Sequence, residues 1–578
     1  MGLAARLERL IPDLSAALLR FPVPSLYSIL LCAYLNIEEI GGSSWDEKIA
    51  YAAAAGFLAS GAAHFFAEGR GLARPANLII ALGAGLAATA AAFFTGVFDT
   101  SLLFFFGAVV LVLMISPYLR ANVSPAALWL FNLRLWLAAL LAALVGIAFG
   151  AGLSAIVEAL DFLFDVELPN DAHAHIWITA TSLVGPLFGL SLMPRDLDEK
   201  IEIAGQQGAL LARGVSVLVN YVLVPLILVY TAILHAYGVK IALQWQLPDG
   251  QLGLMVTIFA LGGTGAWLIA WPWREHGTRL LRWFMQGWFW LCIVPAILLT
   301  IAVWRRVSDY GVTPDRYGIS LVAIWIAALA AYLALRRNAA DMQAIIGGFA
   351  VLLLVGSVGP FGANGLTISS QLGRLAALLE ANGILKEGRI VTPVPALKDE
   401  YNSAGNSMLY ALREAGGMQR LRPWFEGLEK NPFAASTDDW SAVYAVAGVL
   451  GLGDPYLQSD YISLSAAAAL DHDFAAATRL VGPLQAYVPQ AGDTEPPDPS
   501  ARIRDNVLTI RIAGRIWLIP GPDVLTSAKT GAAAAGNRQP PIVYVAGPDI
   551  TLVLEQVYGR TGAKPQLTSA RLWVILRQ

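Results

Sequence analysis

The sequence has few charged residues and almost no cysteine. Only 14% of its 578 residues are Asp, Glu, Lys or Arg, 56% are hydrophobic, and the mean hydropathy is +0.58. A soluble enzyme of this length would carry more charge. Cys32 and Cys292 both lie within apolar stretches, so no disulfide framework is expected. Basic runs are also missing, and we therefore expect no nucleic acid partner.

Sequence signatures of catalysis are missing as well. The chain contains no G-x-S-x-G elbow, no H-E-x-x-H pair and no phosphate-binding P-loop. After the apolar stretches only one histidine remains, His472, and a Ser-His-Asp hydrolase in that region would need it as the base. These gaps favour a non-catalytic protein, and we expect no cofactor.

The sequence is instead dominated by apolar windows. A helix that spans a membrane needs roughly 20 apolar residues, and we count about eleven such windows. Pro22 and Pro24 interrupt the first of them. We predict an α-helical polytopic membrane bundle of about eleven transmembrane helices over residues 20–362. The windows cover residues 20–37, 49–68, 78–94, 101–119, 128–153, 176–193, 217–237, 252–271, 283–304, 319–335 and 345–361.

Charge in the loops predicts the orientation. Residues 1–19 carry leucines at helical spacing with Arg6, Glu8 and Arg9 between them, which predicts an amphipathic helix in the membrane interface. Further along, arginine-rich loops alternate with acidic or neutral ones. Because arginine and lysine concentrate in cytoplasmic loops, we expect a cytoplasmic N-terminus. An odd number of spans then places residues 363–578 on the external side, which in a Gram-negative cell, with the bundle in the inner membrane, is the periplasm.

One predicted external loop, residues 304–317, breaks this charge rule and supplies most of the candidate binding residues. Short translocated loops seldom carry arginine, yet this one has three. Either its two aspartates form salt bridges with the arginines at the membrane interface, or the arginines bind an anionic headgroup or glycan. The candidates are Arg305, Arg306, Asp309, Tyr310, Asp315, Arg316 and Tyr317.

Four further candidates lie within the spans. Tyr230, His235 and Tyr237 lie in the second half of the seventh window, toward the same predicted face as the external loop. Arg134 lies inside the fifth window, where an ionisable side chain either serves a function or extends toward the membrane surface.

A weak metal-binding pattern opens the sixth window. The run Asp171-Ala-His173-Ala-His175 could supply ligands only from an extended segment. In a helix the two histidines would point about 200° apart and could not share an ion. We therefore interpret His173 and His175 as polar interface residues.

Five segments resemble a known family. They are VPLILVYTAILHAY at 224–237, WQLPDG at 245–250, RVSDYGVTPDRY at 306–317, GPFG at 359–362 and SSQLGRL at 369–375. Together they resemble the bacterial membrane family known as domain of unknown function 4153, over most of the chain up to Arg389. Pro314-Asp315 departs from the pattern, in which a glutamate follows Thr313. The resemblance implies the membrane architecture and assigns no reaction or catalytic residue.

The composition changes after residue 362, where no further spanning window occurs. Residues 363–488 are predicted to be mostly helical, and residues 489–500 (PQAGDTEPPDPS) to be a proline-rich linker. Residues 501–578 show a period of two, with a hairpin at 507–519, and predict a small β-rich subdomain. The region after the bundle is therefore predicted to be a C-terminal soluble α+β domain. Residues 531–536 (GAAAAG) are expected to form a flexible loop.

Three functions remain open at this point. The first is an envelope protein whose membrane bundle presents a periplasmic domain that senses or binds a partner. The second is a transporter or lipid-handling protein with an external Arg/Asp/Tyr site. The third is a membrane-embedded transferase that acts on a lipid-linked substrate through Asp309 or Asp315. Beyond the lipid bilayer, the partners expected are envelope proteins, lipids or glycans on the periplasmic side.

Overall fold

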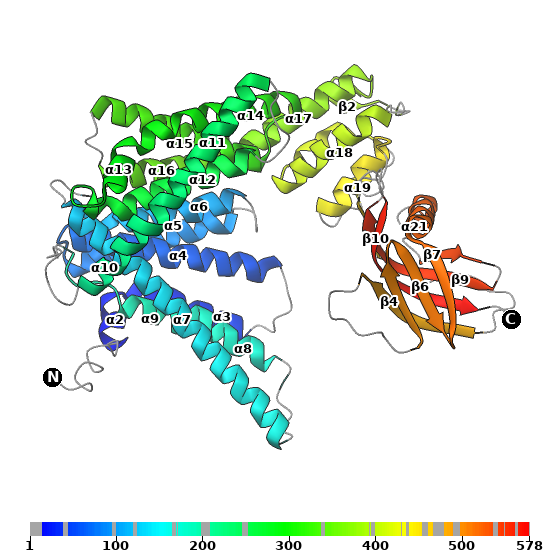
Figure 1. Ribbon diagram of the computed structural model, residues 1–578, viewed down its shortest axis with the longest axis horizontal. Helices are drawn as coiled ribbons and strands as arrows, with labels where there is room; N and C mark the ends of the chain where they lie inside the picture. The colour runs from blue at the N-terminus through cyan, green and yellow to red at the C-terminus, as the bar shows by residue number, and fades with distance from the viewer. Residues whose placement is uncertain are drawn as a thin grey trace. The chain divides into compact units, whose positions relative to one another are not determined.

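Figure 1 shows a computed structural model of the chain, in which contacts define two units. The first unit is Met1–Gln371 with Glu414–Gly417, and the second is Leu372–Arg413 with Met418–Gln578. Residues 1–13, most of the predicted interfacial helix, lie outside the described residues. The structure describes residues 14–37, 44–94, 100–119, 124–164, 169, 171–197, 209–244, 252–336, 341–391, 394, 399–428, 431–434, 439–452, 461–465, 479–488, 498–535, 541–547, 549–560 and 565–576.

The first unit is built of helices. Hydrocarbon offers no hydrogen bonds to the backbone, and a helix satisfies its N–H and C=O groups internally. The helices are α2 Leu14–Arg20, α3 Pro22–Ile37, α4 Ser44–Gly69, α5 Arg74–Phe94, α6 Thr100–Ile115, η1 Ser116–Tyr118, α7 Pro125–Phe164, α8 Ala172–Thr179, η2 Ala180–Val184, α9 Gly185–Ser191, α10 Ala209–Leu218, η3 Val219–Leu223, α11 Val224–Gln244, α12 Leu252–Ala270, η4 Trp271–Trp273, α13 Arg279–Leu291, α14 Ile293–Tyr310, α15 Pro314–Arg336, α16 Met342–Ser357 and the start of α17 Ala363–Ala381.

The number of spans differs from the prediction. Within the described residues, eight helices are long and apolar enough to cross a membrane, or up to nine if the bent pair α2 and α3 is one span. The axes of that pair meet at 109°, where Pro22 and Pro24 interrupt the first window. The window at 176–193 is divided among α8, a π-helical turn and α9. The window at 345–361 forms α16, which has only 16 residues. The predicted count of about eleven is therefore not confirmed.

The outer surface of the spanning helices is apolar. In α7, which has 40 residues, the side chains of Leu140, Leu144 and Ile147 are all exposed on one side of the helix. Soluble proteins rarely expose apolar surface of this extent, because water solvates it poorly. The eight apolar helices therefore indicate a membrane-embedded protein whose solvent is the lipid bilayer.

Helices α6 and α16 form an antiparallel pair that defines two ends of the bundle. Near the start of α16, Gln343 Nε2 donates to the carbonyl oxygen of Tyr118, which follows α6. Near the end of α16, Leu353 lies against Gly107 in the first half of α6. The short helix α16 thus runs beside α6 and η1, which together form the candidate span Thr100–Tyr118.

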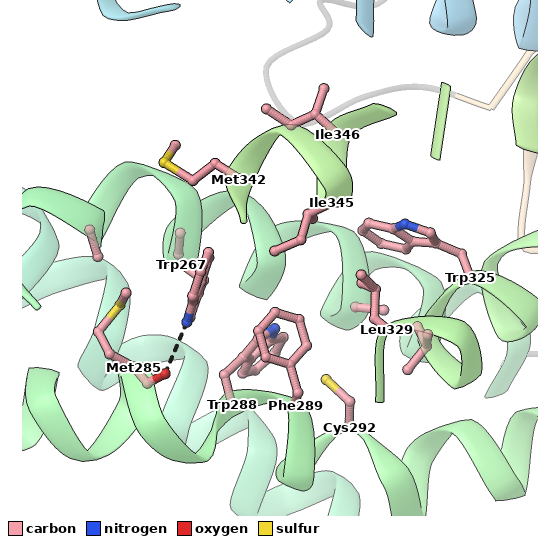
Figure 2. Packing of buried hydrophobic residues seen from close by; sticks show 14 of the residues in the cluster. Trp267, Met285, Trp288, Phe289, Cys292, Trp325, Leu329, Met342, Ile345 and Ile346 are labelled. Atoms are coloured by element: carbon pink, nitrogen blue, oxygen red, sulfur yellow. Dashed lines mark hydrogen bonds between the residues drawn. The ribbon is translucent and has the colours of Figure 1, made fainter. Parts of the chain in front are cut away.

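Buried tryptophans pack the centre of the bundle (Figure 2). Trp288 of α13 is fully buried, and its ring lies directly against Gly263 of α12. Its Nε1 donates to Thr264 Oγ1 at 3.2 Å, and Trp267 Nε1 donates to the carbonyl oxygen of Met285 at 3.0 Å. Both indole N–H groups therefore have acceptors, as burial requires.

The second unit contains the end of α17 and a strand-containing region. Its other helical elements are α18 Asp399–Glu414, η5 Met418–Phe425, α19 Asp439–Val449 and α21 Gly521–Ala535. A two-stranded hairpin, β1 Leu385–Lys386 and β2 Arg389–Ile390, follows α17. The remaining strands are β3 Tyr461–Ser465, β4 Arg479–Tyr487, β5 Ser500–Arg504, β6 Val507–Ile512, β7 Arg515–Pro520, β8 Ile542–Val545, β9 Ile550–Arg560 and β10 Gln566–Leu576.

These strands form a five-stranded and a three-stranded antiparallel sheet. The first has the order β3-β9-β10-β4, with β8 also paired to β9, and the second has the order β5-β6-β7. The predicted hairpin is confirmed, since β6 pairs with β7 through a turn at Ala513 and Gly514, both at positive φ. A core of alternating buried residues lies between the sheets, as the period of two indicates.

Two features of this region differ from the predictions. The prediction of a loop at 531–536 is wrong for residues 531–535, because α21 continues to Ala535. Runs of alanine favour helix more than the flanking glycines oppose it. Strands on both sides of the predicted linker at 489–500 also belong to one sheet, since β4 precedes the linker and pairs with β10, which follows it. Residues 489–497 themselves lie outside the described residues.

Candidate functional site

The polar loop predicted over 304–317 is instead two helix ends joined by three residues. Helix α14 continues to Tyr310 and α15 begins at Pro314, so Arg305, Arg306 and Asp309 all lie on the last turns of α14. The loop prediction was wrong because polar residues at a membrane surface extend the apolar helices without breaking them. Arg305 and Asp309 are exposed, and Arg306 is half-buried.

The end of α14 is held by Gly311 and Arg316. Gly311 has a φ of 77°, a left-handed conformation that suits glycine, and its N–H donates to the carbonyl oxygen of Val307 at 2.9 Å. Arg316 Nη1 donates to the carbonyl oxygens of Gly311 at 2.9 Å and Tyr310 at 3.4 Å. A cation there complements the negative end of the helix dipole. Arg316 thus acts on the backbone of the turn.

The first turns of α17 complete this arrangement. Gln371 is 2% exposed, and its Nε2 donates to the carbonyl oxygens of Val312 at 2.7 Å and Tyr310 at 3.2 Å. The Val312 N–H in turn donates to Ser370 Oγ at 3.0 Å. Ser370 and Gln371 of α17 therefore satisfy backbone groups at and just after the end of α14 that have no partner within that helix.

Tyr317 links the same turn to the segment between α16 and α17. Its hydroxyl donates to the carbonyl oxygen of Phe361 at 2.8 Å, and its ring lies 6.2 Å from that of Phe104 in α6. We call residues 310–317, together with Phe361, Ser370 and Gln371, the junction. Three of the segments that carry the family resemblance, at 306–317, 359–362 and 369–375, supply it. Since Phe104 lies at the start of α6, the junction is at the opposite end of α6 from Tyr118.

The remaining predicted candidates lie away from the junction. Tyr230 packs against Phe259 of α12 with ring centroids 6.0 Å apart, and His235 Nδ1 donates to the carbonyl oxygen of Thr231 at 2.9 Å. Tyr237 is half-buried in the same helix. Asp315 lies in the first turn of α15, where a carboxylate complements the positive end of the helix.

Arg134 lies at the other end of the bundle. It is half-buried, two residues after Asn132, whose Nδ2 donates to the carbonyl oxygen of Met114 at 3.0 Å. Met114 is next to the last residue of α6, so Arg134 is remote from the junction. The structure therefore does not bring Arg134 together with the junction.

The two histidines of the weak metal pattern lie on helix α8 and contact different partners. His173 Nε2 lies 3.2 Å from Glu158 Oε1 of α7. His175 Nε2 lies 3.3 Å from Asp171 Oδ2, and its Nδ1 lies 2.9 Å from Asn36 Oδ1 of α3. Among the described residues, no group of three or more His, Cys, Asp or Glu side chains could hold a metal ion.

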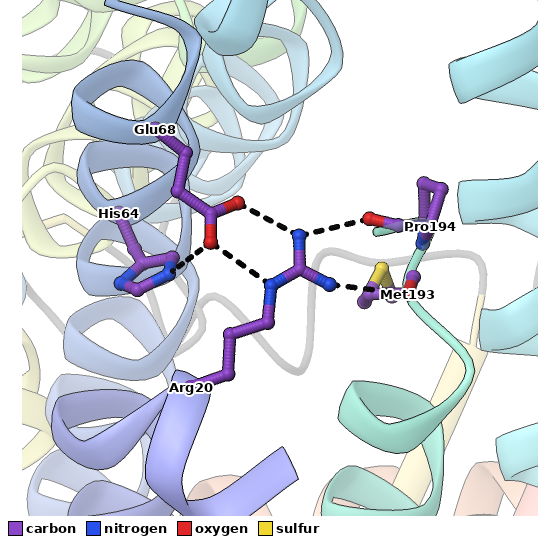
Figure 3. Close-up of polar contacts among 5 residues, drawn as sticks. All are labelled: Arg20, His64, Glu68, Met193 and Pro194. Atoms are coloured by element: carbon purple, nitrogen blue, oxygen red, sulfur yellow. Dashed lines mark hydrogen bonds and ion pairs between the residues drawn. The ribbon is translucent and has the colours of Figure 1, made fainter. Parts of the chain in front are cut away.

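A second polar cluster was missed by sequence reasoning (Figure 3). Arg20 lies at the bend between α2 and α3 and binds Glu68 of α4 through two hydrogen bonds, Nε to Oε1 at 2.9 Å and Nη2 to Oε2 at 2.7 Å. Its guanidinium also donates to the carbonyl oxygens of Pro194 at 2.8 Å and Met193 at 3.3 Å, and His64 Nε2 donates to Glu68 Oε1 at 3.1 Å. Arg20 therefore connects three parts of the chain: the bend between α2 and α3, helix α4, and the segment that contains Met193 and Pro194.

The signal for this cluster was present in the second apolar window. His64 and Glu68 are one helical turn apart in a segment that is otherwise almost free of ionisable groups. Arg20 stands at the start of the first window, and nothing near it in the sequence identifies Glu68 as its partner. A cavity of about 820 Å³ opens beside the three side chains and is also lined by Arg74, Asn77 and Arg195.

Comparison with known proteins places this architecture in a family. Residues 28–370, more than half of the chain, match the family described as Domain of unknown function (DUF4153). The chain belongs to this family. The DUF4153 region spans the helices from within α3 to the first turns of α17, and it ends at Ser370 of the junction. The predicted resemblance is therefore confirmed.

One curated relative is similar to part of the chain. It is the uncharacterized protein PM1469 of Pasteurella multocida, which is 26% identical over 115 residues. That match covers 19% of this chain and 18% of the relative. No solved structure matches the chain.

Proposed function

We propose that this DUF4153 protein is a non-catalytic protein of the bacterial inner membrane that presents residues 363–578 in the periplasm to sense or bind an envelope partner. The bundle anchors the chain, and the strand-containing region supplies the binding surface. The junction holds the start of α17, the helix from which that region continues along the chain.

An exposed apolar face on the three-stranded sheet carries the proposal. In β7, Ile516 is 54% exposed and Leu518 is 68% exposed, whereas Ile519 is buried in the core. Leu518 is opposite Thr509 and Ile516 is opposite Arg511 in the β6–β7 pairing. A hairpin with one buried face normally places polar residues on the other. Exposed isoleucine and leucine there favour a surface that binds another molecule.

The junction chemistry supports a positioning role for the candidate residues. Arg316 donates to two backbone carbonyl oxygens and Tyr317 to a third, so both side chains stabilise the turn. Asp315 lies at a helix start. A transferase base or a headgroup-binding arginine would instead point its polar atoms at a ligand. These contacts favour the partner-binding function over the transferase.

Photo-crosslinking in intact cells tests the proposal. A photoreactive amino acid is placed at Leu518 and, as a matched control, at Lys529, an exposed position on α21. We expect a discrete covalent product from position 518 that is absent from position 529 and is lost when Ile516→Ser removes the neighbouring apolar side chain. Identical products from both positions, or no product from position 518, would contradict a binding role for this face.

A further inference from the structure

The cavity beside Arg20 carries an excess of positive charge. The charge of Arg20 is offset by Glu68, to which it makes two hydrogen bonds. Arg74 and Arg195 also line the cavity and are exposed, and within the part of the chain that the structure describes neither forms an ion pair. These two guanidinium groups in the cavity lining would attract an anion, and phosphate geometry suits arginine in particular.

The cavity also lies where lipid headgroups are found. The candidate span Glu47–Gly69 ends at it, and the next span, Arg74–Phe94, begins at it. Span ends lie at the boundary between hydrocarbon and headgroups. Leu19, Leu72 and Leu78 contribute exposed apolar side chains to the lining. An amphipathic ligand would therefore meet charged groups and apolar surface together.

The cavity thus combines charged groups that would bind an anion with apolar surface that would accept acyl chains. We infer that this cavity binds the headgroup of an anionic phospholipid, such as phosphatidylglycerol. The phosphodiester lies between Arg74 and Arg195, and the acyl chains follow the exposed leucines. Arg20 and Glu68 position the wall of the cavity and do not neutralise the ligand. The assignment goes beyond the proposed function and does not depend on it, because the cavity is at the other end of α6 from the junction.

Lipid binding to the purified full-length protein tests the charge requirement. Phosphatidylglycerol is titrated into detergent-solubilised protein and counted by native mass spectrometry. The double variant Arg74→Gln/Arg195→Gln is expected to bind it at least about tenfold more weakly than the wild type, since each arginine loses a charge-assisted contact. The matched control, Arg279→Gln/Arg282→Gln, removes two exposed arginines that do not line the cavity. Equal affinity in the two double variants would overturn the inference.

A further comparison tests whether the ligand is a lipid. Glycerophosphoglycerol has the same polar group as phosphatidylglycerol without acyl chains and should compete weakly. Competition as strong as that of the lipid would assign the cavity to a soluble phosphodiester and overturn the lipid assignment.

Discussion

Single glycines decide how closely the membrane helices approach. In α12, Gly262, Gly263 and Gly265 look equivalent in the sequence, yet only one of them lies against another side chain. A Cβ on Gly263 would overlap the ring of Trp288, whereas nothing lies within 4 Å of a Cβ on Gly262 or Gly265. Close packing of small residues against large ones stabilises membrane bundles through van der Waals contact.

Gly263→Ala is therefore expected to destabilise the protein by about 1–3 kcal/mol, because the buried indole must move to make room. Gly262→Ala is the control on the same helix and should leave stability unchanged or slightly improved, since alanine favours helix. Thermal unfolding in detergent, followed by tryptophan fluorescence, measures the difference. A Tm for Gly263→Ala equal to that of Gly262→Ala would contradict the packing described.

At the scale of elements, the junction shows how helix ends are satisfied. The last carbonyl groups of α14 have no partner within the helix. Gln371 and Arg316 both donate to the carbonyl oxygen of Tyr310, the last residue of α14, and between them to those of the two residues after it. Ser370 accepts from the N–H of Val312. The turn between α14 and α15 is thus stabilised by a helix that follows it by more than fifty residues.

Gln371→Ala should loosen this turn. The variant leaves the carbonyl oxygen of Val312 without its closest donor, and a lost buried hydrogen bond of this kind costs about 1–3 kcal/mol. We expect faster amide exchange over residues 310–317, about tenfold, measured by hydrogen–deuterium exchange of the full-length protein. Ser369→Ala is the matched control, since Ser369 Oγ donates only within α17, to Leu366. Equal exchange in both variants would show that Gln371 does not hold the turn.

At the scale of the whole molecule, the number of spans determines which side of the membrane receives the C-terminal region. An odd number places the two ends of the chain on opposite sides, and an even number places them on one side. The described helices allow eight or nine spans by length and composition, and α16 runs beside α6 although it has only 16 residues. The periplasmic location is therefore part of the proposal.

Thiol labelling of intact cells tests this orientation. Both native cysteines, Cys32 and Cys292, are buried and are first changed to alanine. Thr526→Cys, on exposed α21, is expected to react with a membrane-impermeant maleimide in intact cells. Arg279→Cys, at a basic loop predicted to be cytoplasmic, should react only after permeabilisation. A thiol at position 526 that is reached only after permeabilisation would place the C-terminal region in the cytoplasm.

The sequence predicted much of the fold and less of the candidate site. Apolar windows at 49–68, 78–94 and 101–119 correspond to α4, α5 and α6, and the hairpin predicted at 507–519 is formed by β6 and β7. Arg316 and Tyr317 were predicted as members of a polar cluster, but their actual acceptors are backbone carbonyl groups. Side-chain type predicts where polar groups gather and does not predict which atoms they meet.

By itself the sequence determined that hydrocarbon is the solvent for most of the chain, that the family is DUF4153, and that the last region contains strands. These conclusions follow from local properties, because the free energy of transfer to lipid and the period of a strand depend on neighbouring residues. Only the tertiary structure decided that Arg20 meets Glu68 and Pro194, and that Gln371 meets Val312. Partners separated by tens to more than a hundred positions are chosen by how helices pack in three dimensions, which no local window of sequence contains.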